Sequence, residues 1–267
     1  MPSLRSLLGA ILTLATTANP CLAGALTEIP GANDGQAPLP AYLARPAGAG
    51  PFPAVVVLHG CGGFNNVAVT WADRLASWGY VAAAIDSLTP RGRTTVCGSG
   101  LNEQTFDAYQ ALKFLAAQPF VRADRVGMLG ISLGGGSALT ALEHDLVEPM
   151  FPVKFRSGVA FYPRCAGMAG VMTAPTLVLV GELDDWTPAA ACRDMAAGKT
   201  GTFGPPREPG DRSMVELVVY PDTHHSFVAS ELRDGIRLYG HWLQYNEAAT
   251  QDAASRVRAF FERTLGN

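Results

Sequence analysis

Short apolar runs recur along the chain, separated by longer segments in which polar and apolar residues are mixed. Runs of this kind, rich in valine, leucine and alanine, predict strands that are buried on both faces. They cover residues 54–58, 80–85, 126–129, 158–162, 174–180 and 214–220. A short strand at the sheet edge is expected near residues 41–44, within a stretch rich in Pro and Gly that spans residues 30–53.

Apolar residues at helical spacing occupy several of the segments between these runs. Residues 67–78 and 106–115 predict helices, and the inward face of a C-terminal helix is marked by Ala253, Val257, Phe260, Phe261 and Leu265. Residues 200–212, rich in Gly and Pro, are expected to form a surface loop. The alternation of strands and helices predicts an α/β fold, a mostly parallel doubly wound sheet flanked by helices, in a single domain.

A glycine-flanked serine follows one of the predicted strands. In Gly130-Ile131-Ser132-Leu133-Gly134 the run 126–129 passes into a small-residue stretch that reads as the start of a helix. Glycines on both sides allow close chain approach and a strained backbone at Ser132, which lifts its hydroxyl above the sheet edge. Ser132 is therefore the candidate nucleophile of a serine hydrolase, with a purely structural turn as the alternative.

A serine hydroxyl is a weak nucleophile unless a base takes its proton and a carboxylate holds that base in one tautomer. Two later strands end in loops that carry such groups, first Asp184 and Asp185, then His224 and His225. The order Ser, Asp, His is the one in which an α/β-hydrolase sheet presents its catalytic groups. We assign His225 as the base and Asp184 as its partner, and we keep Asp185 and His224 as the alternatives.

Acyl transfer also needs hydrogen-bond donors for the oxyanion. The first core strand runs into a glycine-rich turn, residues 59–63, whose backbone N–H groups are expected to point into the active-site cleft. One donor is expected from this turn and the other from the residue after the nucleophile. Leu133 and Cys61 are the candidates, with Gly62 as the alternative to Cys61 and a structural turn as the alternative role.

In combination, these motifs resemble the dienelactone hydrolase family of the α/β-hydrolase superfamily. The matching segments are residues 59–63, 85–91, 130–135, 181–184 and 225–227. The resemblance covers nearly all of the chain that follows the N-terminal segment. It implies an α/β-hydrolase fold and a serine hydrolase that cleaves carboxylic esters or lactones through an acyl-enzyme, with no metal or other cofactor.

The chain departs from the founding enzymes of that family at three positions. It has Ser132 where they use cysteine, Gly60 in place of a glutamate of the oxyanion loop, and Ala229 in place of an arginine that grips the substrate carboxylate. The family places another arginine near Arg91, so we interpret Arg91 as a candidate for binding an anionic substrate group. Arg93 lies in the same loop, and a solvated loop position is the alternative for both.

Several aromatic residues adjoin the expected catalytic loops. Trp186 is the candidate for lining an apolar acyl pocket, together with Tyr162, Phe64 and Phe227. Packing beside the loops is the alternative role for each of them. His59, His144 and His241 are interpreted as structural or solvated histidines.

The first residues have the composition of a secretory signal peptide. A positive charge at Arg5 precedes the apolar run 7–15, and Ala23-Gly24-Ala25 has the small residues that signal peptidase requires. We predict a signal peptide over residues 1–25 and one hydrolase domain over residues 26–267, located in the periplasm or secreted. The apolar run is shorter than the ~20 residues that span a bilayer. Cys21 follows Pro20 rather than the small residues of a lipoprotein signal, so no stable membrane anchor is expected.

Export places the other cysteines in an oxidising compartment. Removal of residues 1–25 leaves Cys61, Cys97, Cys165 and Cys192, which allow three pairings. Because Cys61 and Cys97 follow neighbouring strands, and Cys165 and Cys192 flank the ends of another two, we expect these two local disulfides. Buried unpaired thiols are the alternative.

Composition limits the remaining classes of function. Of the 267 residues 48% are hydrophobic and 16% charged, which is neither a disordered nor a membrane composition, and a formal net charge of −3 does not favour nucleic-acid binding. A nucleotide-binding protein would need G-x-G-x-x-G or a Walker lysine, and residues 130–136 fit neither. We expect a monomer that acts on a small-molecule ester or lactone. A peptidase, a polyester-cleaving enzyme and a non-catalytic binding protein on the hydrolase scaffold are the alternatives.

Overall fold

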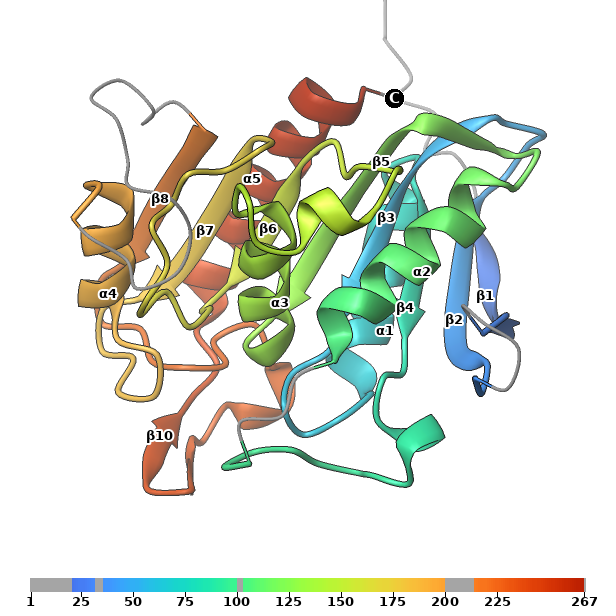
Figure 1. Ribbon diagram of the computed structural model, residues 1–267. Helices are drawn as coiled ribbons and strands as arrows, with labels where there is room; N and C mark the ends of the chain where they lie inside the picture. Colours follow the sequence, from blue (N-terminus) through green and yellow to red (C-terminus); the bar gives the residue numbers. More distant parts are fainter. Residues whose placement is uncertain (1–20, 32–35, 100–102, 200–213, 267) are drawn as a thin grey trace, which may run out of the picture.

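Eight strands form one sheet with helices on both of its faces (Figure 1). The computed structural model describes residues 21–31, 36–99, 103–199 and 214–266. The sheet has the order β1-β2-β4-β3-β5-β6-β7-β8. Its strands are β1 (Cys21–Ile29), β2 (Leu39–Pro46), β3 (Phe52–Leu58), β4 (Val81–Ile85), β5 (Val121–Ile131), β6 (Gly158–Phe161), β7 (Thr176–Gly181) and β8 (Val215–Tyr220).

Strands β3 to β8 run parallel, whereas β2 is antiparallel to both β1 and β4. The helices are α1 (Asn66–Ser77), α2 (Gln104–Ala116), α3 (Leu133–Leu142), α4 (Ala189–Ala196) and α5 (Glu247–Leu265). A small hairpin of β9 (Ile236–Leu238) and β10 (His241–Leu243) forms a separate sheet. Helices α2 and α3 cover the face toward the viewer in Figure 1, and α1 and α5 cover the opposite face.

The parallel strands are buried because helices cover both of their faces. In β3 the five residues Ala54 to Leu58 have no exposed surface, which explains why the run is apolar throughout rather than alternating. Aromatic contacts join the layers, with Trp71 of α1 packed on Phe161 of β6 at 4.8 Å between ring centroids. Tyr80, just before β4, packs on Phe261 of α5 at 5.9 Å.

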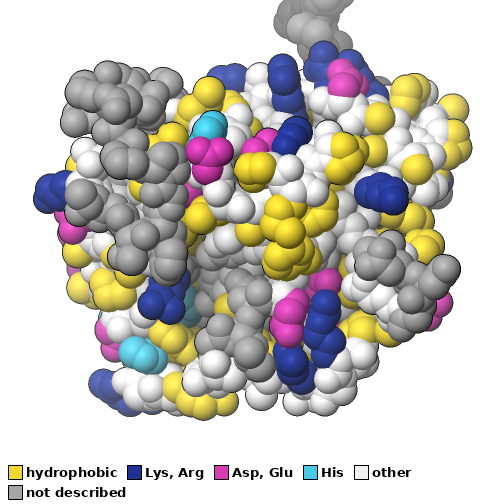
Figure 2. Space-filling view, viewed as in Figure 1, with side chains coloured by type: hydrophobic (Ala, Val, Ile, Leu, Met, Phe, Trp, Pro, Cys, Tyr) yellow, Lys and Arg dark blue, Asp and Glu magenta, His cyan; other side chains and the backbone are white. Residues whose placement is uncertain are grey.

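Asparagine side chains define where two of the helices begin. The side chain of Asn65 accepts a hydrogen bond from the Val67 N–H at the start of α1, and that of Asn246 accepts one from the Ala249 N–H at the start of α5. Charged side chains on the face with α2 and α3 are scattered among hydrophobic ones rather than gathered in one patch (Figure 2). Within the described residues, no helix has the length and apolar character needed to cross a bilayer.

The predicted fold class is confirmed: the chain is a single α/β domain with a mostly parallel sheet. All the predicted core strands and the helices over residues 67–78, 106–115 and the C-terminal segment are present. A strand is present at the predicted residues 41–44, as part of β2, but its expected place at the edge of the sheet is wrong, because β1 pairs with β2 and forms the edge. The surface loop expected over residues 200–212 lies outside the described residues, as do residues 1–20 of the expected signal peptide.

Glycines allow the turn between β5 and α3 to approach the neighbouring strands closely. A Cβ at Gly130 would lie 2.0 Å from the carbonyl oxygen of Gly134. A Cβ at Gly134 would lie 2.6 Å from the carbonyl oxygen of Leu58 and 2.8 Å from that of His59. Because these contacts are with backbone atoms, a side chain at either position displaces α3 from the sheet.

His59 lies at the end of β3 and is fully buried. Its Nδ1 is 2.7 Å from the carbonyl oxygen of Gly60, and its Nε2 accepts a hydrogen bond of 3.2 Å from the Ser87 N–H. This arrangement suits the neutral imidazole with its proton on Nδ1, because a second proton on Nε2 would face the Ser87 N–H. The pKa of His59 is lowered, because burial outweighs the opposing influence of the Gly60 carbonyl and of Asp86. The structural role expected for this histidine agrees with its surroundings.

We predict that Gly134→Ala destabilises the protein by about 1–3 kcal/mol, the range for inserting a methyl group into a well-packed site. The free energy of unfolding in urea measures this change. Gly136→Ala is the matched control, since a Cβ at Gly136 in the same helix has nothing within 4 Å. Alanine is also the better helix former, so the control is expected to be neutral or stabilising. Equal effects of the two substitutions would contradict the close approach described here.

We predict that His59 makes the folded protein less stable in mild acid. Its folded-state pKa is lowered, so below the ordinary value of about 6.5 the unfolded chain binds a proton that the folded protein does not. The contribution of the neutral, buried His59 to the free energy of unfolding is complete above that pH and is lost as the pH falls toward the folded-state pKa. Urea midpoints at pH 7 and pH 5 are therefore expected to differ less in His59→Asn than in the wild type. The same difference in both proteins would refute this role.

Candidate active site

Ser132 lies at the turn between β5 and α3 with an unusual backbone conformation. Its φ of 54° and ψ of −109° fall in a region that non-glycine residues rarely occupy. The conformation is held by hydrogen bonds on both sides: the Ser132 N–H donates to the carbonyl oxygen of Phe161 at 2.9 Å, and the Gly136 N–H donates to that of Ser132 at 3.0 Å. The backbone of Ser132, which carries the hydroxyl, is therefore held in one position at the carboxyl edge of the sheet.

His225 approaches this hydroxyl from the loop after β8. Its Nε2 lies 3.0 Å from the Ser132 Oγ, within hydrogen-bond distance. The side chain of His225 is almost fully buried, and its carbonyl oxygen accepts a hydrogen bond from the Gln244 N–H at 3.1 Å. The loop after β8 thus holds His225 beside Ser132, although the two residues are 93 positions apart in the chain.

Asp184 completes a continuous chain of hydrogen bonds. Its Oδ2 lies 2.7 Å from the His225 Nδ1, and both side chains are almost inaccessible to solvent. Its Oδ1 accepts hydrogen bonds from the backbone N–H groups of Trp186 at 3.0 Å and Thr187 at 2.8 Å. The Thr187 Oγ1 lies 3.0 Å from the Asp184 Oδ2. These contacts hold the carboxylate facing the imidazole of His225.

The two alternatives that the sequence left open lie elsewhere. Asp185 accepts a hydrogen bond from the Trp242 N–H at 3.1 Å and is 3.6 Å from the His241 Nδ1. The His224 Nδ1 lies 3.1 Å from the carbonyl oxygen of Leu183, and its ring packs edge-on against that of Trp242 at 6.4 Å. The structure thus brings together Ser132, His225 and Asp184, and not their neighbours. Thr187 is an addition that the sequence analysis missed, although its place directly before Pro188 is a signal for a turn.

Aromatic rings fix the plane of the His225 imidazole. The ring of Tyr162 lies edge-on to the imidazole at 4.7 Å between ring centroids, and the ring of Trp186 is tilted against it at 5.2 Å. Burial, reinforced by the charge of Asp184, raises the pKa of Tyr162 well above its ordinary value, so its hydroxyl stays neutral. Phe227 is fully buried and packs edge-on against Tyr162 at 5.3 Å, and Phe64 packs against the core. Of the four aromatic candidates, Trp186 is the one that lines the cavity.

The candidate oxyanion donors border the same cavity as Ser132. Leu133 is the first residue of α3, where backbone N–H groups have no partner within the helix and the helix dipole is positive. Cys61 lies in the turn after β3 and also lines the cavity. The carbonyl oxygen of Cys61 accepts a hydrogen bond from the Val96 N–H at 2.9 Å, which holds this turn in place.

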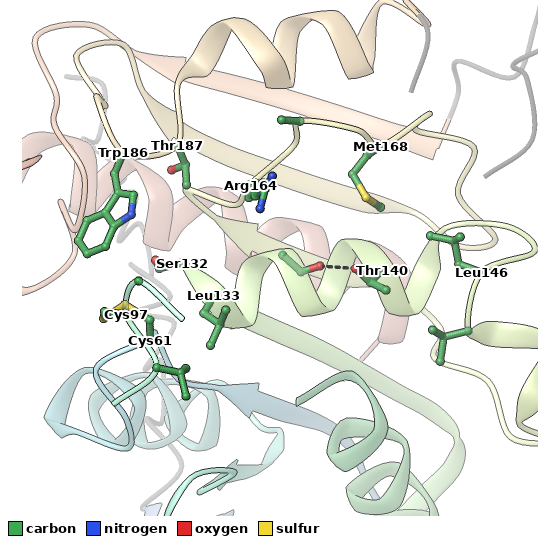
Figure 3. Close-up of a pocket in the computed structure, with 15 residues that line it drawn as sticks. Cys61, Cys97, Ser132, Leu133, Thr140, Leu146, Arg164, Met168, Trp186 and Thr187 are labelled. Atoms are coloured by element: carbon green, nitrogen blue, oxygen red, sulfur yellow. Dashed lines mark hydrogen bonds between the residues drawn. A yellow bond between two sulfur atoms is a disulfide. The ribbon is translucent and has the colours of Figure 1, made fainter. Parts of the chain in front are cut away.

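The cavity has a volume of about 790 Å³ and is lined mainly by apolar side chains. Figure 3 shows Ser132, Leu133, Trp186, Thr187 and Arg164 around it. Within the described residues, Arg164 is the one charged side chain that lines the cavity. The sequence analysis missed Arg164, although it follows β6 at the same sheet edge as the other loops.

Arg91, the predicted substrate-binding arginine, is not among the residues that line the cavity. Its guanidinium forms two hydrogen bonds with the buried carboxylate of Asp107, at 2.8 and 2.9 Å, and a third with the carbonyl oxygen of Ser87. The bond to Asp107 raises the pKa of Arg91. Arg93 is similarly paired with Glu103. Both arginines therefore stabilise the loop after β4.

Two disulfides join loops around the cavity in the expected pairing. Cys61 is bonded to Cys97, which ties the turn after β3 to the loop after β4. Cys165 is bonded to Cys192, which ties the loop after β6 to α4. Both cysteines of the first pair line the cavity, and the second pair adjoins Arg164. The disulfides are consistent with an oxidising environment.

Comparisons with known proteins agree with this geometry. The family model described as "Dienelactone hydrolase family" matches residues 39–265. A putative carboxymethylenebutenolidase of Methylorubrum extorquens is 30% identical over 282 residues, with 94% of this chain and 84% of that protein covered. A probable 2-oxo-3-(5-oxofuran-2-ylidene)propanoate lactonase of Bradyrhizobium is 28% identical, with 74% of this chain and 82% of that protein covered.

Solved structures show the same fold. A putative dienelactone hydrolase from Klebsiella pneumoniae superposes with a TM-score of 0.70 at 23% identity, covering 92% of this chain and all of that one. An esterase from Thermogutta terrifontis superposes with a TM-score of 0.63 at 15% identity, covering 91% and 95%. With the family model matched across nearly all of the sheet and through the last helix, the chain belongs to the dienelactone hydrolase family.

Proposed function

We propose that this chain hydrolyses carboxylic esters or lactones through an acyl-enzyme formed on Ser132. The observation that carries the proposal is the unbroken hydrogen-bond chain from the Ser132 Oγ through the His225 imidazole to the Asp184 carboxylate, at 3.0 and 2.7 Å. This arrangement activates a serine for acyl transfer on several unrelated folds. Membership of the dienelactone hydrolase family supports the same class of reaction.

The first half of the reaction forms the acyl-enzyme. As the Ser132 Oγ attacks the substrate carbonyl carbon, its proton passes to the His225 Nε2, and the carbonyl oxygen becomes an oxyanion. The N–H groups of Leu133 and Cys61 stabilise that oxyanion, and Asp184 stabilises the imidazolium. When the tetrahedral intermediate collapses, the C–O bond to the alcohol breaks and His225 gives its proton to the leaving oxygen.

The second half releases the acid. Water replaces the alcohol beside His225. His225 takes a proton from this water while the water oxygen attacks the acyl carbon. A second oxyanion forms at the same N–H groups and collapses, the bond to the Ser132 Oγ breaks, and His225 returns the proton to the serine. In a lactone the alcohol and the acid belong to one molecule, so a single hydroxy acid leaves.

The surroundings of the serine bear on the substrate. Two relatives are named as enzymes that act on unsaturated lactones, which supports ring esters as candidates for this chain. Arg91 is engaged with Asp107, whereas Arg164 borders the cavity and is exposed. For a substrate that carries a carboxylate we therefore propose Arg164, rather than Arg91, as the group that binds it.

We further propose that the protein is exported and that its signal peptide is cleaved after Ala25. The two disulfides support an oxidising compartment. Cleavage there would remove the first residues of β1 and keep the segment from Leu26 to Ile29, which pairs with β2 and ends in a fully buried isoleucine.

Replacement of the nucleophile tests the proposed reaction directly. Ser132→Ala is expected to lower kcat for p-nitrophenyl acetate by about 10⁶, the scale measured for loss of a serine nucleophile. A fluorophosphonate probe is expected to label the wild type on the peptide that contains Ser132 and to leave the variant unlabelled. Unchanged urea midpoints would show that the variant is folded. Turnover by Ser132→Ala at the rate of the wild type would refute the proposal.

The carboxylate assignment has a matched control in the next residue. Asp184→Asn is expected to lower kcat by about 10³–10⁴, because the amide no longer holds the His225 tautomer that accepts the serine proton. Asp185→Asn changes the same functional group one position away and is expected to have a far smaller effect. Steady-state kinetics on one ester compares the two. A larger loss in Asp185→Asn would reverse the assignment.

A further inference from the structure

The hairpin of β9 and β10 is anchored directly to the loops that hold the candidate triad. The Trp242 N–H of β10 donates to Asp185, the neighbour of Asp184, at 3.1 Å. Leu243 forms a β-bridge with His225. Figure 1 shows β10 beyond the carboxyl edge of the sheet. The hairpin is therefore a fixed extension of the site on the side of the histidine.

The register of the hairpin determines which side chains share a face. Leu238 is paired with His241 and Ile236 with Leu243, so these four side chains lie on one face. Arg237 and Trp242, which are paired with each other, lie on the other face. The first face therefore carries three aliphatic side chains together with His241.

Trp186 links this face to the catalytic histidine. Its ring stacks on that of His241 at 4.9 Å with an interplanar angle of 14°, and it lies 5.2 Å from the ring of His225. Tyr239, in the turn of the hairpin, lies 6.0 Å from Trp186. A continuous series of rings thus runs from the imidazole of His225 to the hairpin.

The apolar side chains at the end of this series are exposed. Ile236 is 44% exposed, Leu238 39% and Tyr239 59%, on a segment where solvent contact favours polar residues. In Figure 2 the corner where Figure 1 places β10 carries hydrophobic side chains beside a histidine and basic ones. We call Trp186, Ile236, Leu238 and Tyr239 the aromatic shelf. The shelf continues from a residue that lines the cavity.

The chemistry of the reaction identifies which portion of an ester substrate lies on the His225 side of Ser132. The group that protonates the leaving oxygen must be within hydrogen-bond distance of it, so the alcohol portion of an ester lies next to His225. We propose that the aromatic shelf is the binding subsite for the alcohol portion and selects esters of bulky apolar alcohols. This inference rests on the proposed function and adds a substrate preference to it.

A pair of acetate esters isolates the alcohol portion. Ethyl acetate and 2-phenylethyl acetate share the acyl group and have primary alkoxide leaving groups, so their intrinsic reactivities are similar. The wild type is expected to have a higher kcat/KM for the phenylethyl ester. In the double variant Leu238→Thr with Tyr239→Asn, the ratio of the two kcat/KM values is expected to fall about tenfold. Asparagine tolerates the positive φ of 50° at position 239, so the turn is preserved.

Two further variants separate recognition from damage to the hairpin. Arg237→Thr alters the opposite face and is expected to leave the ratio as in the wild type, whereas Leu238→Met keeps an apolar side chain and is expected to retain the preference. A wild-type ratio near one, or a ratio that the double variant does not lower, would overturn the shelf while ester hydrolysis itself stands. A fall of the same size in Arg237→Thr would also overturn it. If the wild type cleaves neither ester, the shelf is contradicted, and hydrolysis of a lactone and labelling of Ser132 by the fluorophosphonate probe then decide separately whether the proposed function stands.

Discussion

The arrangement of the site depends on the close approach of the β5–α3 turn to strands β3 and β6. Gly134 lies against the carbonyl oxygens of Leu58 and His59 with no room for a Cβ, and the Ser132 N–H is bonded to Phe161 on the other side. The turn is therefore held from both neighbouring strands at once. This contact directs the serine hydroxyl out of the sheet and places the first N–H groups of α3 beside it, so nucleophile and oxyanion donor depend on the same packing.

The other two members of the triad are positioned by a different means. Asp184 is held by two backbone N–H groups and a threonine hydroxyl from the residues that follow it, all within three positions. His225 is held by its neighbours across space, Tyr162, Trp186 and the strand β10. Thus the carboxylate is oriented by local turn geometry and the imidazole by tertiary packing, and the two meet because β7 and β8 end at the same edge of the sheet.

Much of this could be predicted from the sequence because parallel strands buried on both faces read as uninterrupted apolar runs. The loop after each run then lies at one edge of the sheet, and this alone groups Ser132, Asp184 and His225. The contacts of Arg91 could not be predicted in this way. Its position in a loop at the correct edge is visible in the sequence, but its partner Asp107 is buried in α2, and only the packing of that helix shows where the guanidinium points. Strand β1 was missed because its first five residues were interpreted as the end of a signal peptide, and β9 and β10 because three residues carry too little periodicity.

The two disulfides have an order along the chain that bears on how the protein acquires them. The loops that they close span 36 and 27 residues and follow one another without overlap. For a chain that meets an oxidant from its N-terminal end onward, the next of these thiols to appear after Cys61 is Cys97, and the next after Cys165 is Cys192. On such a route, pairing of each thiol with the next one along the chain gives the two native bridges.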